Sequence, residues 1–333
     1  AVGNGDGGSS LVNAGNIIIT GGSVIGTGVN KVATGIVASE LSAGSAGTIS
    51  VTQNANVSAS NFGLQTVNNG TGAVTVNFGT AAGSSLTLSS GNIGINTQSN
   101  NAGATGAVNI NVGNSGIGAG STTITATNRG ISATAVGITD TTVALGDNVK
   151  IDPADYGVFI KTGGDATFTS GNAMSITVND TVDKDNIGVG IYAESTRAAD
   201  VAVGNPSVEV TVGTNAAFSI NSNNGQAIRA VNSGNGTGGV SVITGAGLNM
   251  DVKGDHASGI VAIADTNGDL AANGAGNINV KTGSGLITVD GTVDVSGVAG
   301  TLGASNGILG ASAGGNVLID TNQSVADTVI SVK

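Results

Sequence analysis

Apolar and polar residues alternate along most of this chain, and the alternation recurs as pairs of apolar residues two positions apart. Two residues at this spacing lie on one face of a β-strand. Ten such pairs follow one another at intervals of 25 to 39 residues, with a mean near 33. We therefore expect each pair to mark the same strand of a repeating unit. The pairs are Ile17/Ile19, Ile49/Val51, Val74/Val76, Val108/Ile110, Val143/Leu145, Ile176/Val178, Val208/Val210, Val240/Val242, Ile278/Val280 and Val317/Ile319.

Each repeating unit holds two further strands. Upstream of most pairs lies a segment of the form GI-x-A, as in TGIVA at 34–38, RGISA at 129–133, GIYA at 190–193 and AIRA at 227–230. Downstream lies a third alternating segment, as in Leu86/Leu88, Val149/Ile151, Phe218/Ile220, Leu248/Met250/Val252 and Val293/Val295. The unit is three short strands separated by Gly, Asn and Ser turns.

The repeat predicts an all-β fold, a right-handed parallel β-helix (β-solenoid) of about ten coils with three strands per coil. Helical arrays of similar repeat length are excluded because 58 of the 333 residues are glycine, and each glycine costs a helix about 1 kcal/mol. Coils stacked about 4.8 Å apart would form a rod about 45–50 Å long. We expect a single domain over 1–333, with 1–15 as an N-terminal cap or irregular segment and 16–332 as coils.

Charge is sparse and unevenly distributed. Only 9% of residues are charged, yet the net charge is −11, and all of it lies in residues 140–333. Residues 41–128 have no charged side chain at all. An acidic half disfavours nucleic acid, which needs clustered cations. The neutral segment predicts a surface of Ser, Thr, Asn and Gln, through which two copies could associate by hydrogen bonds.

No apolar run approaches the roughly 18 residues needed to span a bilayer, so we expect no membrane insertion of this segment.

The repeating string of GI-x-A, a small polar turn, G-x-V-x-V and a further Gly turn resembles the passenger domains of bacterial type V (monomeric) autotransporters. The strongest matches are residues 225–254 and 61–79, and the resemblance covers almost the whole chain. It implies export across the outer membrane to the cell surface or medium. The translocator barrel that completes such proteins is missing from this sequence, so the resemblance implies a passenger segment.

The resemblance implies a binding function and leaves its kind open. The favoured hypothesis is an adhesin or virulence factor that engages host cells or other bacteria, with a host cell-surface receptor, a matrix protein or a glycan as partner. A released host-receptor ligand that mimics a growth factor is the alternative, and a polysaccharide-processing β-helix enzyme is the second. We expect no cofactor.

Few residues suggest catalysis or metal binding. The one histidine, His256, precedes a strand, and a turn histidine is the simplest interpretation. The segment GDGGSS at 5–10 resembles a serine-protease nucleophile loop but has a Gly where that loop has its Ser. The segment Asp265-Thr-Asn267-Gly-Asp269 places oxygen ligands at alternate positions, as calcium loops do, but it lacks their distal glutamate. It is a calcium candidate, with a polar turn as the other interpretation. We predict no catalytic residue.

The longest departures from the repeat come at 179–206 and 263–277, with another at 296–315, and the densest charge lies between residues 179 and 206. Function in a solenoid is expected in such departures from the repeat. We predict a docking surface for a basic partner, with solvated loop charges as the alternative interpretation. The candidate residues are Asp152, Asp155, Tyr156, Asp180, Asp183, Asp185, Tyr192, Glu194 and Asp200.

Seven aromatic residues occur in the chain, and alternation places most of them inside the coils. Tyr156 and Tyr192 lie near corresponding GI-x-A strands, beside the acidic segments. They are the two aromatics that we assign to the predicted partner surface.

Overall fold

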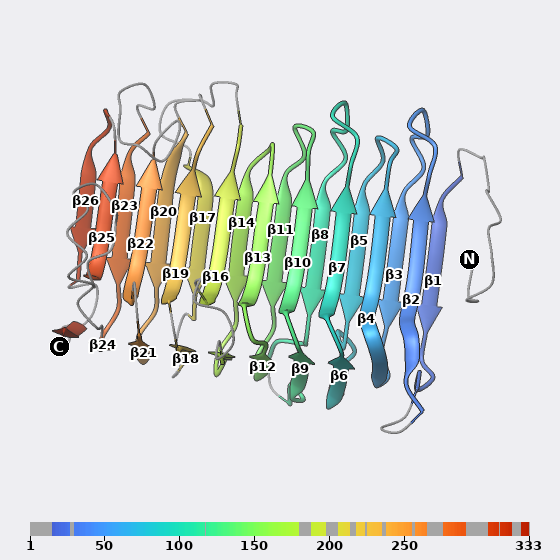
Figure 1. Cartoon of the computed structure of the whole chain (residues 1–333), viewed down its shortest axis with the longest axis horizontal. Helices are drawn as coiled ribbons and strands as arrows, with labels where there is room; N and C mark the ends of the chain where they lie inside the picture. The colour runs from blue at the N-terminus through green and yellow to red at the C-terminus, as the bar shows by residue number, and fades with distance from the viewer. Residues whose placement is uncertain are drawn as a thin grey trace.

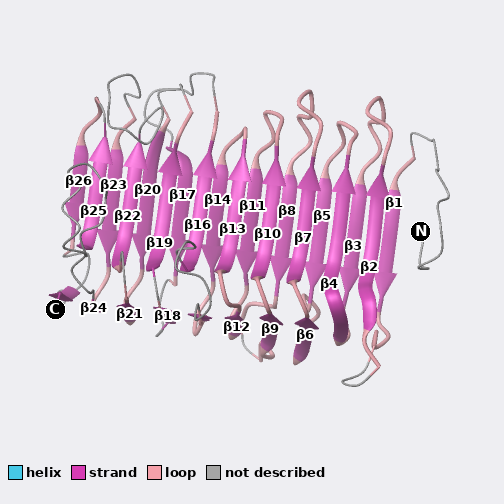
Figure 2. Ribbon diagram, viewed as in Figure 1, coloured by secondary structure: helices cyan, strands magenta, loops and turns pink. Residues whose placement is uncertain are grey.

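The computed structural model shows a parallel β-helix whose strands stack side by side from one end of the molecule to the other (Figure 1). The structure describes residues 15–26, 30–116, 118–179, 188–197, 206–213, 218–223, 225–234, 238–254, 257–264, 276–290, 306–312, 314–321 and 328–332. Figure 2 shows strands and turns throughout this described part. Among these residues, no helix is long and apolar enough to cross a membrane.

One side of the rod is a ten-stranded parallel sheet, here called sheet A. Its strands are β1 (Ile17–Gly21), β3 (Ile49–Gln53), β5 (Val74–Phe78), β8 (Val108–Val112), β11 (Thr141–Leu145), β14 (Ala166–Ser170), β17 (Pro206–Val212), β20 (Gly239–Thr244), β23 (Ile278–Thr282) and β26 (Val317–Asp320).

The GI-x-A segments form a second series of paired strands, here called ladder B. Its strands are β2 (Val32–Glu40), β4 (Val57–Asn68), β7 (Ile93–Ser99), β10 (Arg129–Ala135), β13 (Tyr156–Thr162), β16 (Gly188–Ser195), β19 (Gly225–Asn232), β22 (Ser258–Ala264) and β25 (Asn306–Ser312).

A third series, ladder C, is joined to ladder B through the long strand β4, whose first residues pair with β6 and whose later residues pair with β7. The other strands of ladder C are β6 (Leu86–Ser90), β9 (Thr122–Ala126), β12 (Val149–Asp152), β15 (Ser175–Val178), β18 (Phe218–Ser222), β21 (Leu248–Lys253), β24 (Gly285–Asp290) and β27 (Thr328–Val332). Three strands per coil is therefore confirmed. The predicted third-strand segment Val293/Val295 lies outside the described residues, and the ladder C strand that follows β23 is β24.

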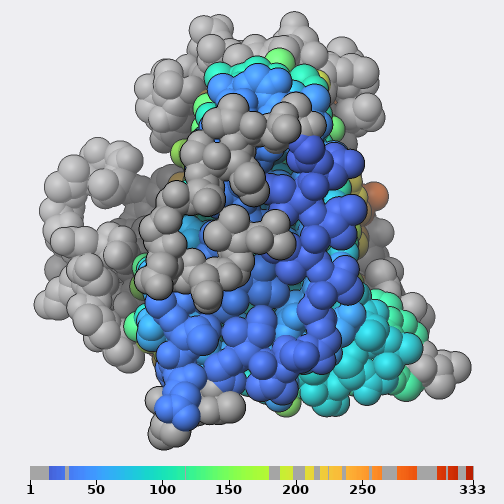
Figure 3. Space-filling model, turned by 90° about the vertical axis from the view of Figure 1, so that its right-hand side faces the viewer, coloured from blue at the N-terminus to red at the C-terminus, as the bar shows by residue number. Residues whose placement is uncertain are grey.

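The coil is right-handed. In Figure 1, ladder B runs upward on the near side and sheet A runs downward behind it, while the chain advances from right to left. Figure 3 looks along the rod from its N-terminal side, where the first coils cover most of those that follow.

Alternate side chains of all three series point inward and form one continuous core. In sheet A the inward column includes Val76, Ile110, Val143, Val210 and Val242, all fully buried. Hydrophobic burial of such columns by the neighbouring coils stabilises the stack, since each coil alone would expose them.

One of the ten predicted pairs was assigned to the wrong series. Ile176/Val178 lies in β15 of ladder C, where Ile176 pairs with Ile151 and Ile220. The corresponding strand of sheet A is β14, which contributes Ala166 and Phe168 to the inward face. Small Ala166 weakens the apolar pattern there, so the pattern in the next strand was the stronger signal. The other nine pairs lie in sheet A as expected.

The glycine of GI-x-A is required by the close approach of successive coils. A Cβ on Gly157 would lie 2.4 Å from the carbonyl oxygen of Gly190 and 2.3 Å from a methyl carbon of Ile176. Both distances are far inside van der Waals contact, and Gly63, Gly94 and Gly130 meet the same obstruction. The glycines of successive GI-x-A segments form a row along ladder B, and at most positions of this row a larger residue would clash. The exception is β19, where Ala227 occupies the corresponding position.

The turn that leaves ladder B is held by the last side chain of the strand. The side-chain oxygens of Asn68, Thr162, Ser195 and Asn232 each accept a hydrogen bond from the backbone N–H two residues later, at 2.8 to 3.3 Å. In this Asx or hydroxyl turn, the side-chain oxygen accepts from a backbone N–H that no longer pairs with a neighbouring strand once the chain changes direction. The polar residue thus fixes where ladder B ends and the path to sheet A begins.

Candidate functional site

The outward position x of GI-x-A forms a straight column on the surface of ladder B. In the middle of the rod this column reads Ser132, Phe159, Tyr192 and Arg229, one residue from each of β10, β13, β16 and β19. Neighbouring parallel strands lie about 4.8 Å apart, so side chains in one column are in contact range. The column places together residues that are 27 to 37 positions apart in the sequence.

The rings of this column stack on one another. Phe159 and Tyr192 are nearly parallel, with an interplanar angle of 5° and centroids 5.0 Å apart. Tyr156, from the adjacent outward column, meets both rings edge to face at 5.2 and 6.0 Å. Such aromatic pairs contribute about 0.5–1.5 kcal/mol each beyond the area they bury.

Arg129 covers the free side of the stack. Its guanidinium carbon lies 4.1 Å from the ring centroid of Phe159 and 5.0 Å from that of Tyr156, which is cation–π geometry. Burial lowers the pKa of Arg129, while Tyr156 and Asp155 act in the opposite sense. We call Arg129, Tyr156, Phe159 and Tyr192 the aromatic cluster.

Glu194 anchors the edge of the cluster. Its carboxylate accepts hydrogen bonds from the Tyr192 hydroxyl at 2.7 Å and the Ser233 hydroxyl at 2.6 Å, and forms a salt bridge with the Lys161 ammonium at 2.9 Å. Burial acts to raise the pKa of Glu194, but these three partners outweigh burial and lower it. The group is therefore an ionised carboxylate at neutral pH.

The Tyr192 hydroxyl is held in its protonated form. Burial is the main cause that raises its pKa, and the hydrogen bond it donates to Glu194 adds to the effect. A phenol with a raised pKa is not a general base at neutral pH. Its role in the cluster is to donate a hydrogen bond.

Cations outnumber carboxylates on this part of the surface. Among the described outward positions of β10, β13, β16 and β19, the cations are Arg129, Lys161 and Arg229, and the carboxylate is Glu194. Lys161 is bound to Glu194, and Asp155 in the turn before β13 partly offsets Arg129, so the two arginines leave the strip with a small positive charge. This is a local reversal in a chain of net charge −11.

The structure brings three of the predicted partner residues together, namely Tyr156, Tyr192 and Glu194. Asp155 lies in the turn before β13, near Arg129. Asp152 ends β12 in ladder C, where it accepts a hydrogen bond from Asn179. The remaining candidates lie outside the described residues: Asp180, Asp183, Asp185 and Asp200.

The calcium candidate Asp265, Asn267 and Asp269 also lies outside the described residues, as does His256. Within the described part, no group of three or more His, Cys, Asp or Glu side chains is placed to hold a metal ion.

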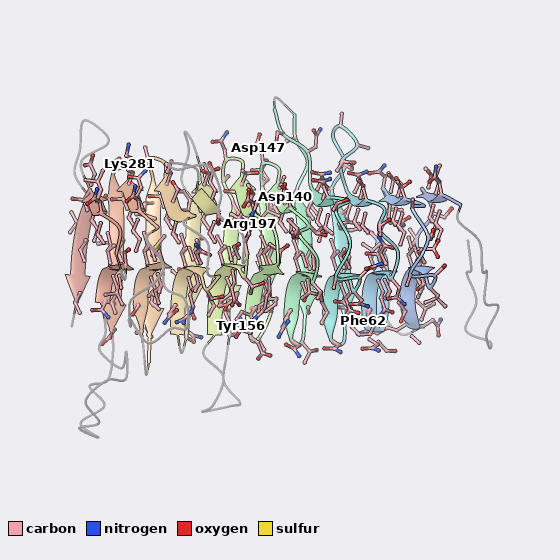
Figure 4. The ribbon with its side chains drawn as sticks, turned by 90° about the horizontal axis from the view of Figure 1, so that it is seen from above. Phe62, Asp140, Asp147, Tyr156, Arg197 and Lys281 are labelled. Atoms are coloured by element: carbon pink, nitrogen blue, oxygen red, sulfur yellow. The ribbon has the colours of Figure 1, made fainter. Side chains whose placement is uncertain are left out.

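Sequence reasoning missed Arg129, Phe159 and Arg229 as site residues. The expectation that most aromatics point inward was also wrong, because only Phe78, Phe168 and Phe218 are buried in the core. Phe62 and Tyr156 lie on the ladder B side of the rod, opposite Lys281 of sheet A (Figure 4). The sequence did contain a signal for this cluster. Position x of GI-x-A is Phe159, Tyr192 and Arg229 in three successive repeats, and in a regular stack these residues lie side by side.

The outer face of sheet A is of a different kind. From β3 to β8 its outward residues are Ser50, Thr52, Thr75, Asn77, Asn109 and Asn111. The Asn77 amide donates to the Thr52 hydroxyl at 3.2 Å, and the Asn111 amide donates to the Asn77 side-chain oxygen at 2.8 Å. This neutral face lies within residues 41–128, the segment predicted to self-associate.

The rod therefore presents a neutral hydrogen-bonding face on sheet A and a cationic aromatic cluster on ladder B. Comparisons with known proteins add no identity to this description: no family model, no curated protein and no solved structure matches the chain.

Proposed function

We propose that this chain is a binding module displayed on or released from a bacterial surface, in the manner of an autotransporter passenger, and that it attaches to host cells or to other bacteria. The observation that supports the proposal best is the aromatic cluster. Its ring stack and its arginine lie on the outside of the rod, apart from the inward-facing core that the coils share.

The scaffold suits attachment. Strands of sheet A keep the same register from β1 to β26 except for a bulge in β17, so outward residues form long straight columns. A rod of this kind offers extended side faces at fixed spacing. Its binding residues are held by paired strands and not by loops alone.

The same geometry favours binding over catalysis. Tyr192 donates a hydrogen bond to Oε2 of Glu194, and Lys161 forms a salt bridge with the same oxygen, while Ser233 donates to Oε1. Both oxygens of the carboxylate are therefore bound by groups of the chain itself. Glycoside hydrolysis requires two carboxyl groups across a bond to be cleaved, whereas the Glu194 carboxylate is bound by these three groups and Asp155 interacts with Arg129.

The proposal is tested with beads coated with the purified chain and applied to host epithelial cells and to bacteria. We expect attachment that rises with coating density, without receptor phosphorylation and without release of sugar products. Receptor phosphorylation by the soluble chain would favour the released ligand, and product release would favour the enzyme. Beads that attach no better than uncoated beads at any density would refute the binding function.

A further inference from the structure

Two of the three arginines in the chain bracket the stacked rings. Arg129 lies over Phe159 on the β10 side, and Arg229 follows Tyr192 in register on the β19 side. The strands β10 and β19 are three spacings apart, which is about 14 Å along the rod. The order along the axis is therefore arginine, ring, ring, arginine.

Stacking leaves the edge of a guanidinium available. A guanidinium that lies flat on a ring keeps its N–H donors in its own plane, where a planar carboxylate can accept two of them. The described donations of the two arginines are long: Arg129 to the Ser132 hydroxyl at 3.4 Å, and Arg229 to the Gln226 amide oxygen at 3.5 Å. Both side chains are positioned, and a guanidinium with five donors keeps further N–H groups available beside these long contacts and beside the attraction between Arg129 and Asp155.

Phe159 does not offer a stacking platform. It faces Tyr192 at 5.0 Å, and Arg129 covers its other face. A base or a neutral sugar that needs a free face of this ring finds both faces occupied. The two arginines that bracket the stack favour recognition of anions.

The surroundings favour a hydroxyl-rich ligand. Toward the N-terminal side, the outward residues of ladder B include Gln65, Gln98 and Thr134, all half-buried and uncharged. Gln65 lies in the column of Phe159, and Gln98 and Thr134 lie in the adjacent column of Lys161. Their amide and hydroxyl groups can exchange hydrogen bonds with the hydroxyl groups of an extended polymer. The strip thus combines two cations at fixed spacing with neutral donors and acceptors along the same axis.

We propose that the aromatic cluster and Arg229 bind a carboxylated polysaccharide, a polyuronate chain that lies along the rod with carboxylates on Arg129 and Arg229. The inference rests on the proposed binding function and names its ligand. Arginine forks match carboxylates in shape, which selects a uronate over a neutral polymer.

The test measures binding of the purified chain to immobilised polygalacturonate, with dextran as the neutral polymer, heparin as the sulfated one and polyglutamate as the acidic peptide. We expect binding to polygalacturonate that weakens as salt rises, and none to dextran. Arg129→Gln and Arg229→Gln should each weaken it at least tenfold. Arg197→Gln is the matched control, because Arg197 binds Asp165 in the turn after ladder B and lies outside the strip.

Arg229→Gln leaves the ring stack in place, so it tests the proposal even if Arg129→Gln unfolds the protein. Unchanged affinity in Arg229→Gln, or equal binding to dextran, would overturn the proposal. Stronger binding to heparin or to polyglutamate than to polygalacturonate would overturn the assignment of a uronate ligand in favour of a sulfated polymer or an acidic peptide. If coated beads attach to cells while polygalacturonate does not bind, the ligand assignment fails and the binding function stands; if the beads do not attach, the binding function itself fails.

Discussion

The guanidinium carbon of Arg129 lies 4.1 Å from the ring centroid of Phe159, although the two residues belong to different coils and to different outward columns. The contact exists because Arg129 pairs with Tyr156 while Phe159 lies three residues further along β13. A slip of one residue in the register would turn Phe159 toward the core. The surface cluster is therefore a direct product of the register between coils.

Val210 and Val242 are partners in sheet A, and both are fully buried. Val210→Asp should lower the free energy of unfolding by at least about 3 kcal/mol, since the carboxylate would be buried without a partner. Urea unfolding followed by circular dichroism measures the change.

Thr211→Asp is the matched control, because Thr211 is the next residue and points outward. It should change stability by no more than about 0.5 kcal/mol. Equal losses in the two variants would show that the inward face of β17 is assigned wrongly.

The glycine row makes a steric prediction. Gly157→Ala forces a Cβ against the Gly190 carbonyl and Ile176, and should destabilise the protein by about 1–3 kcal/mol. Gly44→Ala places its Cβ in open space and should leave the melting temperature unchanged. Thermal melts of the two variants measure the difference. An unchanged melting temperature for Gly157→Ala would mean that the coils move apart more easily than their contacts indicate.

Glu194 gives the protein a pH dependence on the acid side. Because its folded pKa is lowered, its stabilising contribution is present above the pKa of an unfolded glutamate and is lost as pH falls through the folded value. Glu194→Gln should cost about 2 kcal/mol at pH 7 and progressively less below about pH 4. Denaturant titrations of both proteins from pH 7 to pH 3 measure the difference. A constant gap over this range would contradict the ionised network with Lys161 and Tyr192.

The neutral face of sheet A predicts self-association that is insensitive to salt, because no charge pairs are screened there. Sedimentation at low and high salt should give the same association constant. Thr75→Asp with Asn109→Asp places like charges on β5 and β8 and should abolish association. Gln65→Glu with Gln98→Glu on ladder B should leave it intact. A chain that is monomeric at every concentration would end this proposal.

Periodicity alone predicted the fold, because a β-helix repeats its inward pattern in each coil and GI-x-A keeps a glycine at most of the positions where coils approach most closely. It failed at β14, where Ala166 is too small to stand out from the surrounding residues. The site was predicted in part. Tyr156, Tyr192 and Glu194 were identified by charge and aromaticity, whereas Arg129 and Phe159 come into contact only through the pairing of separate coils, which depends on the lengths of the intervening turns.

The direction of the hydrogen bonds between coils has a mechanical consequence. These bonds run along the rod, so tension applied along the axis loads them lengthwise and in series. The outermost coil would detach first, and the next would bear the load only after the first had unwound. The coil between Val74 and Val108 spans 34 residues and would release roughly 110–120 Å of extended chain. A rod built this way yields to a pull in steps, each of which lengthens the chain between its two ends.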